Sequence, residues 1–403
     1  MKYDALVLGA GPAGATAALM LARAGWSVAV VEKTGFPRRK VCGEFVSATS
    51  LPLLHELGID RAFLKLAGPE VRRVGLFAQE TILASAMPPT GDSVGRWGRA
   101  LGREHLDVLL LQAAVRAGAR LWQPWAATEL QRSKDGYVCN ITANGAGKQL
   151  VARIVIAAHG SWERGVLPTQ SAKTQTPSDL LAFKAHLKDC DLPPDLMPLL
   201  VFPGGYGGMV HTDSGRVSLS CCIRRDELRR CRRRHQKQHA AAAVLQHIQV
   251  SCLGVRQALG RAGLDGAWLS AGPIRPGMRR RYKDGIFLVG NIAGEAHPIV
   301  AEGISMAMQS AWLLCRRLIA NQEDVVAGRT VAEVGRSYAA EWDAGFAMRI
   351  RAAAVFAHVA MRPNAVSLLL PMLRRFPGIL TFGAQLSGKT RQIISAPHAR
   401  TAP

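Results

Sequence analysis

Apolar and polar positions at the start of the chain follow a pattern that is typical of an α/β protein. Residues 4–8 form a short apolar run, and small and apolar residues then recur at helical spacing over residues 13–24. A run rich in β-branched residues follows at 27–32, and glycines separate the first run from the helical segment. A strand, a glycine-rich turn, a helix and a strand within about thirty residues predict a βαβ unit with two parallel strands.

The rest of the chain divides into a strand-rich middle and a helical end. The pattern predicts strands within 71–87, 119–130, 136–143, 150–158, 180–188 and 198–223, and one more at 286–289. Helical spacing is found over 47–57, 103–117, 224–249, 303–319 and most of 330–403. Strands of one sheet therefore occur on both sides of a β-rich segment, which predicts an inserted domain.

We therefore expect an α/β fold of three regions. Residues 1–170 and 271–325 are expected to form a discontinuous nucleotide-binding domain, and residues 171–270 an inserted antiparallel-sheet domain that holds the substrate. Residues 71–95 are expected to add strands to the inserted domain. Residues 326–403 are expected to form a C-terminal helical region.

Gly9, Gly11 and Gly14 satisfy the pattern G-x-G-x-x-G between the first predicted strand and the first predicted helix. In this context the first glycine permits a tight turn, the second lets the backbone approach a pyrophosphate, and the third lets helix and strand pack closely. Glu32 ends the second strand, where a carboxylate accepts hydrogen bonds from ribose hydroxyls and repels a 2′-phosphate. The turn therefore predicts FAD or NAD rather than NADP.

The segment 285–312 favours FAD over NAD. A buried strand leads to Gly290 and Asn291, and the asparagine side chain is suited to hydrogen-bond a ribityl hydroxyl. A loop then leads into a helix of small residues that begins at Gly303. The positive end of that helix is expected to face the N1/C2 carbonyl edge of a flavin, where it would favour the reduced, anionic form.

Residues 1–45, 99–165 and 285–315 together resemble the flavoprotein superfamily that contains the para-hydroxybenzoate-hydroxylase-type monooxygenases and the geranylgeranyl-reductase-like enzymes. The resemblance implies a Rossmann-like FAD-binding domain of the GR2 type. Gly102–Asp107 is similar to the S-R-x-x-L-D helix of the family, whose arginine approaches the FAD. The resemblance therefore implies this role for Arg103.

Two segments resemble the reductase-like branch in particular. Lys40–Glu44 is similar to its K-x-C-G segment, which passes beside the isoalloxazine ring, and Ala301–Ile304 stands where that branch has G-E-G-I. The chain departs from the monooxygenases in two places, with Gly290-Asn291 for their Gly-Asp and His159-Gly160-Ser161 for their Asp-Gly. The W-x-W-x-I-P signature of flavin halogenases does not occur in the sequence.

These motifs predict three groups of site residues. The cofactor contacts are expected to be Gly9, Gly11, Pro12, Ala13, Gly14, Glu32, Lys33, Arg39, Lys40, Cys42, Arg103, Gly160, Gly290, Asn291, Gly303 and Ile304. Cys42 and His297 are the catalytic candidates, for substrate placement or proton delivery, and an ordinary structural role is the alternative for both. The residues expected to line the substrate pocket, with core packing as the alternative, are Phe202, Tyr206, Met209 and His211.

The charge of the chain predicts attraction to anions. Lysine and arginine number 51 and aspartate and glutamate 29, which gives a formal net charge of +22. Seven arginines lie between Arg224 and Arg234, and the stretch Val366–Leu386 combines apolar residues with Arg374 and Arg375. Besides a solvated helix face, we consider an acidic acyl carrier protein or an anionic membrane surface as partners. Nucleic acid is not expected, because no basic and aromatic platform accompanies the charge.

Eight cysteines without ligand spacing predict free thiols and no metal site. We expect a soluble cytoplasmic protein, with attachment to the membrane surface as the alternative. No apolar run approaches the ~20 residues of a membrane span, and no small-x-small cleavage site follows the apolar N-terminal stretch.

Three functions remain open from the sequence. The first is an NAD(P)H-dependent FAD monooxygenase that hydroxylates an apolar aromatic or polyketide-like small molecule. The second is a flavin-dependent C=C reductase of the geranylgeranyl-reductase type, to which Lys40–Glu44 and Ala301–Ile304 point. The third is a basic flavoprotein that serves as a docking module without catalysis.

Overall fold

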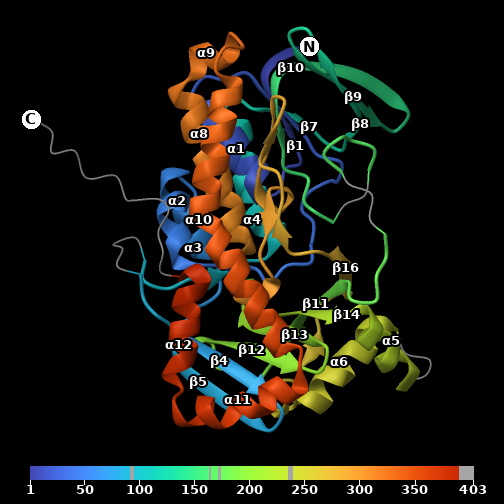
Figure 1. Ribbon diagram of the computed structural model, residues 1–403, viewed down its shortest axis with the longest axis vertical. Helices are drawn as coiled ribbons and strands as arrows, with labels where there is room; N and C mark the ends of the chain where they lie inside the picture. Colours follow the sequence, from blue (N-terminus) through green and yellow to red (C-terminus); the bar gives the residue numbers. More distant parts are fainter. Residues whose placement is uncertain (91–94, 163–164, 171–173, 235–238, 390–403) are drawn as a thin grey trace, which may run out of the picture.

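The structure, a computed structural model, describes residues 1–90, 95–162, 165–170, 174–234 and 239–389. Two β-sheets lie toward opposite ends of an elongated molecule, and the long helix α10 (Val331–Ala360) runs along it from one to the other (Figure 1). The predicted α/β architecture is confirmed, and its two sheets frame the site described below.

The first sheet is built on the parallel strands predicted at the N-terminus. β1 pairs in parallel with β2 on one side and with β10 on the other, and β7 and β19 extend the parallel arrangement. Its order is β18-β19-β10-β1-β2-β7, and β8 and β9 continue antiparallel from β10. The strands are β1 (Lys2–Leu8), β2 (Val28–Val31), β7 (Arg120–Trp122), β8 (Ala126–Ser133), β9 (Gly136–Ala143), β10 (Ala146–Ala157), β18 (Tyr282–Lys283) and β19 (Ile286–Leu288).

Helix α1 (Pro12–Arg23) packs between α4 (Arg103–Arg116) and α8 (Gly303–Ala320) beside this sheet. Small residues dominate its buried positions, among them Ala15, Ala17 and Ala18. Small side chains let neighbouring helices approach closely, and that packing fixes the helix N-termini relative to the strand ends.

The second sheet has the order β15-β11-β14-β13-β12-β4-β5, with β16 also paired to β11. Its pairs are antiparallel except β4 with β12, which run parallel. One face packs on α5, α6 and α7, and the other faces α10 and α11. The strands are β4 (Arg73–Ala78), β5 (Thr81–Ala86), β11 (Leu180–Lys188), β12 (Leu196–Phe202), β13 (Gly205–His211), β14 (Val217–Arg224), β15 (Gly263–Leu264) and β16 (Leu269–Ile274).

Several elements differ from the sequence-based expectations. The single helix expected over 224–249 is divided into α5 (Arg225–Arg234) and α6 (Ala240–Ser251), with 235–238 outside the described residues. The second sheet extends to Ile274, beyond the expected boundary at residue 270, whereas β4 and β5 join it as expected for residues 71–95. The shorter helices are α2 (Leu51–Glu56), α3 (Asp60–Leu66), α7 (Leu253–Ala258) and α9 (Gln322–Val326), and two small strand pairs are β3 (Phe45–Val46) with β6 (Arg99–Ala100) and β17 (Gly277–Met278) with β20 (Gly294–Glu295).

The C-terminal helices α11 (Pro363–Arg375) and α12 (Gly378–Ala384) follow α10 and lie beside β4 and β5 at the end of the molecule remote from the N-terminus (Figure 1). Among the described residues, no single helix has the length and composition needed to cross a bilayer. The pair α10 and α11 meets that criterion together but is bent by 101°.

Candidate functional site

A cavity of about 940 Å³ lies between the two sheets and the C-terminal helices. At one end it reaches the glycine turn, the start of α1 and the end of β2. At the other end its walls are β12, β13 and the inner faces of α10, α11 and α12. One cavity therefore joins the predicted dinucleotide site to the predicted substrate sheet.

The glycine turn has the geometry that a pyrophosphate needs. Gly9 has φ +102°, and a Cβ on Gly14 would lie 1.8 Å from the carbonyl oxygen of Gly9, so both positions require glycine. A Cβ on Gly11 would instead meet the guanidinium of Arg103 at 3.5 Å, on the cavity side. Gly11 is the N-cap of α1 and no side chain caps that helix, so its first amide groups are free to bind phosphate oxygens.

Glu32 is buried at the end of β2 and is held by the turn itself. Its Oε2 accepts a hydrogen bond from the amide of Ala10 (3.0 Å), and its Oε1 accepts one from the amide of Thr34 (2.9 Å). Arg38 lies 3.4 Å from the same carboxylate. The carboxylate is therefore fixed at the cavity wall in the place where a ribose hydroxyl would bind.

The basic segment after β2 corrects one prediction. Lys33, Arg38 and Lys40 line the cavity, but Arg39 is not among the lining residues that the structure describes. Its guanidinium pairs with Glu104 (3.2 Å) and Asp265 (3.0 Å) on the outer side of the segment. Successive side chains of this extended segment point in different directions, so Arg38 rather than Arg39 accompanies Lys40 at the cavity.

Arg103 begins α4 and is buried beside the glycine turn. It forms two hydrogen bonds with Asp107, Nε to Oδ1 at 2.6 Å and Nη2 to Oδ2 at 2.8 Å. Burial alone would lower the pKa of Arg103, but the Asp107 carboxylate outweighs it and raises that pKa above its usual value. A fixed, permanently charged guanidinium over Gly11 is suited to a pyrophosphate.

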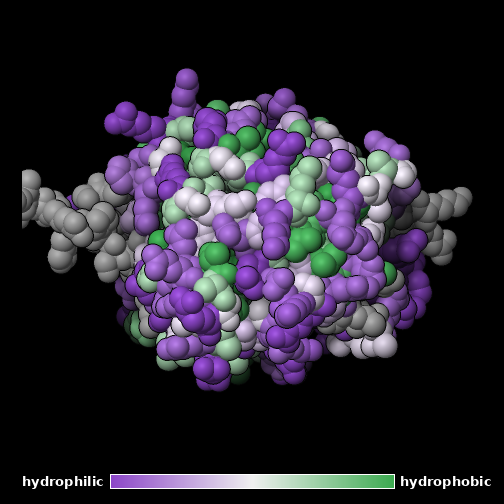
Figure 2. Space-filling model, turned by 90° about the horizontal axis from the view of Figure 1, so that it is seen from above, coloured by the Kyte–Doolittle hydropathy of each residue, from purple (hydrophilic) through white to green (hydrophobic). Residues whose placement is uncertain are grey.

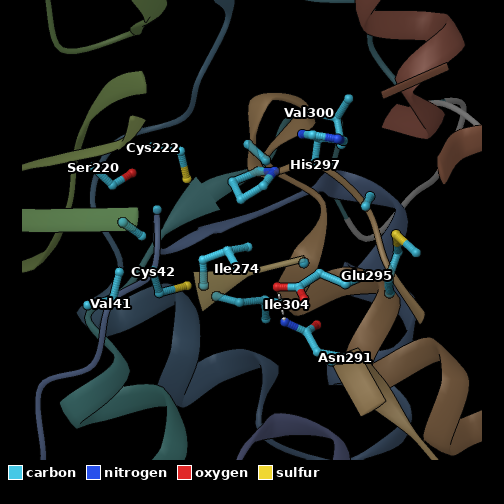
Figure 3. Close-up of a pocket in the computed structure, with 18 of the residues that line it drawn as sticks. Val41, Cys42, Ser220, Cys222, Ile274, Asn291, Glu295, His297, Val300 and Ile304 are labelled. Carbon is cyan, nitrogen blue, oxygen red and sulfur yellow. Dashed lines mark hydrogen bonds between the residues drawn. The ribbon is translucent and has the colours of Figure 1, made fainter. Parts of the chain in front are cut away.

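At the predicted flavin end, Asn291 and Glu295 point toward one another and into the cavity (Figure 3). The Asn291 amide nitrogen donates to Glu295 Oε1 (3.0 Å), and the Ser161 hydroxyl donates to Glu295 Oε2 (2.6 Å). Gly290 has φ +67°, and a Cβ there would lie 3.0 Å from the side chain of Ala13. Glu295, which sequence reasoning did not place in the site, therefore orients the predicted ribityl partner.

The start of α8 completes this end of the cavity. Gly303 and Ile304 line it, and no side chain caps the N-terminus of this 18-residue helix. The partial positive charge of the helix therefore faces the place expected for the flavin carbonyl edge. Glycine turn, arginine, strand-end carboxylate and two open helix ends together fit FAD.

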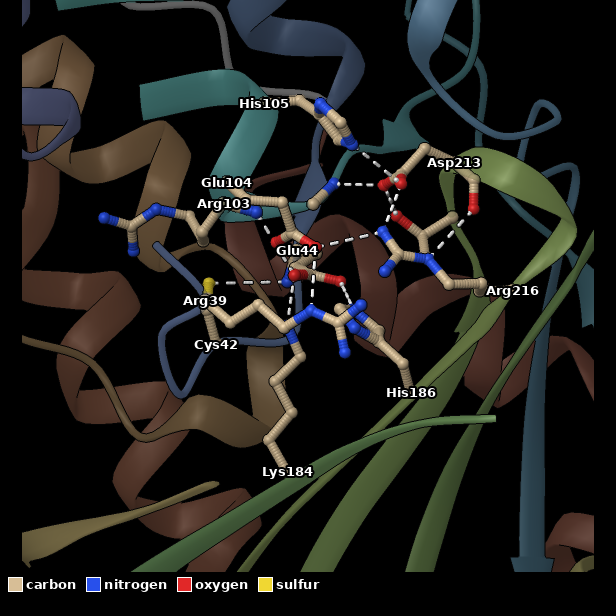
Figure 4. A network of polar contacts seen from close by, with 12 residues as sticks. Arg39, Cys42, Glu44, Arg103, Glu104, His105, Lys184, His186, Asp213 and Arg216 are labelled. Carbon is tan, nitrogen blue, oxygen red and sulfur yellow. Dashed lines mark hydrogen bonds and ion pairs between the residues drawn. The ribbon is translucent and has the colours of Figure 1, made fainter. Parts of the chain in front are cut away.

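The K-x-C-G-like segment is anchored by a buried ion cluster (Figure 4). Glu44 is 0% exposed and has φ +64°, and its carboxylate binds Lys184 Nζ and, at 2.7 Å, His186 Nε2. Burial would raise the pKa of Glu44, but His186 and Lys184 lower it to about 2. The same carboxylate accepts the amide hydrogen of Arg103 (3.2 Å), so Glu44 connects the start of α4 to β11 of the second sheet.

Cys42 lies two residues before this anchor and lines the cavity. Its Sγ accepts a hydrogen bond from the amide of Glu44 (3.4 Å). The Arg103 guanidinium also interacts with the thiol. Two donors therefore face the sulfur, which makes it a hydrogen-bond acceptor in this structure.

A second ion network lies beside the first (Figure 4). Asp213 accepts the amide hydrogen of Gly102 (2.7 Å) and pairs with Arg216, which also reaches Glu104 (3.1 Å). His105 Nε2 lies 3.2 Å from Asp213. Glu104, His105 and Asp213 are close enough to share a cation, but the guanidinium of Arg216 already neutralises the carboxylates. The network therefore serves as a second link between α4 and the second sheet.

At the substrate end, two of the four residues predicted to line a pocket do so and two do not. Tyr206 and Met209 line the cavity, whereas Phe202 and His211 are not among its described lining residues. Phe202 points to the opposite face of the sheet and packs edge-on against His247 (ring centroids 5.7 Å apart). His211 Nε2 bonds to the carbonyl oxygen of Leu192 (2.7 Å), which turns its ring away from the cavity.

Tyr206 and His297 form a hydrogen-bonded pair within the cavity. The phenol oxygen lies 3.1 Å from His297 Nδ1. Burial raises the pKa of Tyr206 well above its usual value, and burial together with the nearby His358 lowers the pKa of His297 to about 4. Both groups are therefore uncharged near neutral pH. Figure 3 shows His297 across the cavity from Cys42. Cys222, the β14 partner of Tyr206, lies above Cys42 in this view.

The remaining wall at this end is apolar and comes largely from the C-terminal helices. No sequence motif pointed to these residues as part of the site. The lining side chains are Leu76, Leu199, Val201, Val355, Phe356, Val359, Val366, Leu369, Leu373, Ile379 and Leu380. Such a wall favours an apolar substrate.

Most of the residues predicted to contact the cofactor line the cavity. Gly14 and Arg39 lie outside the described lining, the first because it serves helix packing and the second because it faces outward. The residues that do line the cavity are Gly9, Gly11, Pro12, Ala13, Glu32, Lys33, Lys40, Cys42, Arg103, Gly160, Gly290, Asn291, Gly303 and Ile304.

The comparison with protein families agrees with this geometry. A family model described as an FAD binding domain matches residues 2–343, which is most of the chain. The chain belongs to this family. It is an FAD-dependent oxidoreductase of the superfamily that contains the geranylgeranyl-reductase-like enzymes and the flavin monooxygenases.

Individual relatives are distant but extend over most of the chain. The conditioned medium factor receptor 1 of Dictyostelium discoideum is 26% identical over 79% of this chain and 63% of its own length. The digeranylgeranylglycerophospholipid reductase 2 of Methanopyrus kandleri is 26% identical over 86% of this chain and 83% of its own. Among solved structures, a flavin-dependent brominase matches with a TM-score of 0.75 over 98% of this chain and 96% of its own, at 18% identity, which shows a shared fold.

Proposed function

We propose that this flavoprotein reduces a carbon–carbon double bond in a long apolar substrate, with electrons supplied to its FAD by NADH or NADPH. The relative from Methanopyrus kandleri, which aligns over most of both chains, is named as a reductase of a geranylgeranyl lipid. The apolar wall formed by α10, α11 and α12 supports a substrate of the same character.

The observation that carries the proposal is the uncharged pair of Tyr206 and His297 in this apolar cavity. Saturation of a double bond needs a hydride at one carbon and a proton at the other. A phenol whose pKa is raised by burial stays protonated until a strongly basic carbon develops beside it. Tyr206 is therefore suited to supply the proton.

In the proposed reaction the hydride and the proton come from different groups. FAD held by the glycine turn, Glu32 and Arg103 would, once reduced by the nicotinamide, supply the hydride for one carbon of the double bond. Tyr206 gives its phenolic proton to the adjacent carbon, so two C–H bonds replace the π bond. His297 returns a proton from Nδ1 to the phenolate oxygen while Nε2 takes one from solvent. NAD(P)H is oxidised and the substrate is reduced by two electrons.

Cys42 has a different part in this proposal. Its sulfur accepts the amide hydrogen of Glu44 and faces the Arg103 guanidinium, so its environment favours an acceptor rather than a proton donor. We therefore assign Cys42 to positioning at the cofactor end and the proton to the Tyr206–His297 pair.

The mass of the product distinguishes this reaction from hydroxylation. The holoenzyme is incubated without oxygen with NADH or NADPH and a C20 polyprenyl alcohol, and the products are analysed by mass spectrometry. Saturation adds about 2 Da per double bond and needs no O₂, which is the result expected of a reductase. A product about 16 Da heavier that forms only with O₂ would establish a monooxygenase and refute the proposal.

The proton donor is tested with Tyr206→Phe, and Tyr3→Phe, outside the cavity lining, is the matched control. Loss of a general acid lowers the rate of the chemical step by about 10²-fold or more. We expect this loss in Tyr206→Phe with unchanged flavin content and unchanged reduction of the flavin by the nicotinamide. An unaltered saturation rate would show that another group delivers the proton.

A further inference from the structure

The C-terminal part of the chain has an unusual charge composition. Asp343 is the last acidic residue, and the 60 residues that follow contain eight lysines and arginines and no aspartate or glutamate. Four of the arginines, Arg351, Arg362, Arg374 and Arg375, are exposed on α10, α11 and at their ends. Within the described residues no carboxylate lies at ion-pair distance from any of the four.

The same segment exposes large apolar side chains. Leu368 is 81% exposed, and Phe376 and Phe382 are each 57% exposed. Leu368, Met372 and Arg375 follow one another at helical spacing on the outer face of α11, so apolar and cationic groups share that face. The Arg375 guanidinium lies 5.2 Å from the ring centroid of Phe376. An exposed apolar face bordered by cations is typical of an interaction surface.

The opposite end of the molecule has a different character. Figure 2 shows it from above, with hydrophilic side chains over most of the face and apolar ones in small separate groups. The helices α11 and α12 lie at the other end (Figure 1). The end of the molecule that Figure 2 shows therefore has no apolar face comparable to that of α11 and α12.

We propose that the outer face of α11 and α12, defined by Leu368, Met372, Arg375, Phe376 and Phe382, docks on the surface of an anionic lipid bilayer. Apolar side chains that enter the acyl region and cations that contact lipid phosphates are the two components of such binding. A small acidic protein would satisfy the arginines but would leave the aromatic and aliphatic side chains without an apolar environment. The bilayer accounts for both features at once.

The inner face of the same helices lines the cavity. Leu369 and Leu373 of α11 and Leu380 of α12 contact the cavity, whereas Leu368, Met372 and Phe382 face outward. A single layer of helix therefore separates the lipid surface from the substrate end. If the proposed reaction is correct, the docked face brings an apolar substrate to the cavity directly from the bilayer.

Sedimentation with lipid vesicles tests the docking without any turnover. The holoenzyme is mixed with vesicles of phosphatidylcholine alone and with vesicles that contain phosphatidylglycerol, and the bound fraction is measured. We expect binding to the anionic vesicles and little to the neutral ones, with a decrease as salt is raised. Equal binding to both, or no binding to either, would overturn the proposal, and so would binding to an acidic acyl carrier protein in place of vesicles.

Variants locate the surface. Leu368→Ser, Phe376→Ser and Phe382→Ser combined should lower the partition coefficient at least 100-fold. The matched control removes three apolar side chains exposed elsewhere, Leu64→Ser, Val250→Ser and Leu264→Ser, and should bind normally. Equal losses in the two triple variants would refute the assignment.

A second pair of variants tests the cation of this face. Arg375→Gln should lower binding about five-fold, which is the factor that one arginine near an anionic surface contributes; Arg374 is left unchanged because its guanidinium donates to Thr81 Oγ1 of β5. Arg232→Gln, on the exposed side of α5, removes the same charge from another surface. Equal losses in the two variants would indicate attraction by net charge alone and overturn the proposed face. Failure of the saturation assay, by contrast, would leave these binding results unchanged.

Discussion

The buried carboxylate of Glu44 allows a quantitative test of how the two halves of the site are held together. Glu44→Gln removes one negative charge at a position that is 0% exposed and leaves the ammonium of Lys184, 1% exposed, without its partner. Removal of one partner from a buried ion pair typically destabilises a protein by about 3–5 kcal/mol. The pKa of Glu44 leads to a similar figure, since a decrease from 4.5 to about 2 corresponds to about 3 kcal/mol.

We therefore expect Glu44→Gln to lower the free energy of unfolding by about 3 kcal/mol at pH 7. The measurement is denaturant unfolding followed by far-ultraviolet circular dichroism at a fixed excess of FAD. Lys184→Met in the same chain removes the unpaired ammonium, so the double variant should regain most of the lost stability. The Arg103 amide loses a charged acceptor in both variants, which should weaken flavin retention in both.

The pH dependence of the free energy of unfolding independently tests whether the Glu44 carboxylate stabilises the fold. The pKa of Glu44 is lower in the folded protein than its usual value, so its stabilising effect is fully present above pH 4.5 and is lost as the pH falls toward 2. The difference between the parent protein and Glu44→Gln should shrink over that interval. A single variant that loses less than about 1 kcal/mol, or a double variant as unstable as the single one, would refute the reasoning.

Three further predictions concern the cofactor and the proton donor. Gly14→Ala should unfold the glycine turn, since its Cβ would lie 1.8 Å from the carbonyl oxygen of Gly9. Gly11→Val should instead give a folded protein without bound flavin, which is measured by loss of the flavin absorbance at ~450 nm. A yellow Gly11→Val protein would contradict this. Arg103→Met with Asp107→Leu removes both charges of a buried pair, so circular dichroism should show a folded protein and absorbance a reduced flavin content. His297 has a pKa of about 4 against 6.5 when unfolded, so stability falls as the pH drops from 6.5 to 4, and His297→Asn should flatten that slope in thermal unfolding.

The dinucleotide end of the site could be predicted from the sequence because its chemistry is local. Gly9, Gly11 and Glu32 lie within one βαβ unit, and the spacing of that unit determines where the three groups meet. Asn291 and Gly303 follow a strand that joins the same sheet edge, so their place at the cavity also follows from local order. Arg39 was placed wrongly because the direction of one side chain in an irregular basic segment depends on Asp265, far away in the chain.

The substrate end depends on long-range contacts that a single sequence does not reveal. Whether Phe202 or Tyr206 lines the cavity depends on which face of the second sheet meets it. The strands that carry them, β12 and β13, have similar patterns of apolar residues, so the sequence does not distinguish the two faces. Lys184 and His186, two polar residues in the interior of the largely apolar strand 180–188, were the available signal for a buried partner. Identifying Glu44 as that partner required the fold.

The two ion clusters explain how one cavity can serve a fixed cofactor and a variable substrate. Glu44 and Asp213 both bind the first residues of α4 and both hold cations of the second sheet, so the distance between the sheets is set at the cofactor end. The opposite wall comes from α11 and α12, whose described lining residues are apolar and form no charge pairs. The pair of Lys389 with Glu302 lies beyond the end of α12. Apolar packing tolerates changes of shape better than a buried ion pair tolerates loss of a partner. Substitutions in α11 and α12 should therefore alter which apolar substrate is bound while FAD binding is retained. Substitutions at Glu44 or Asp213 should affect the binding of both substrate and FAD.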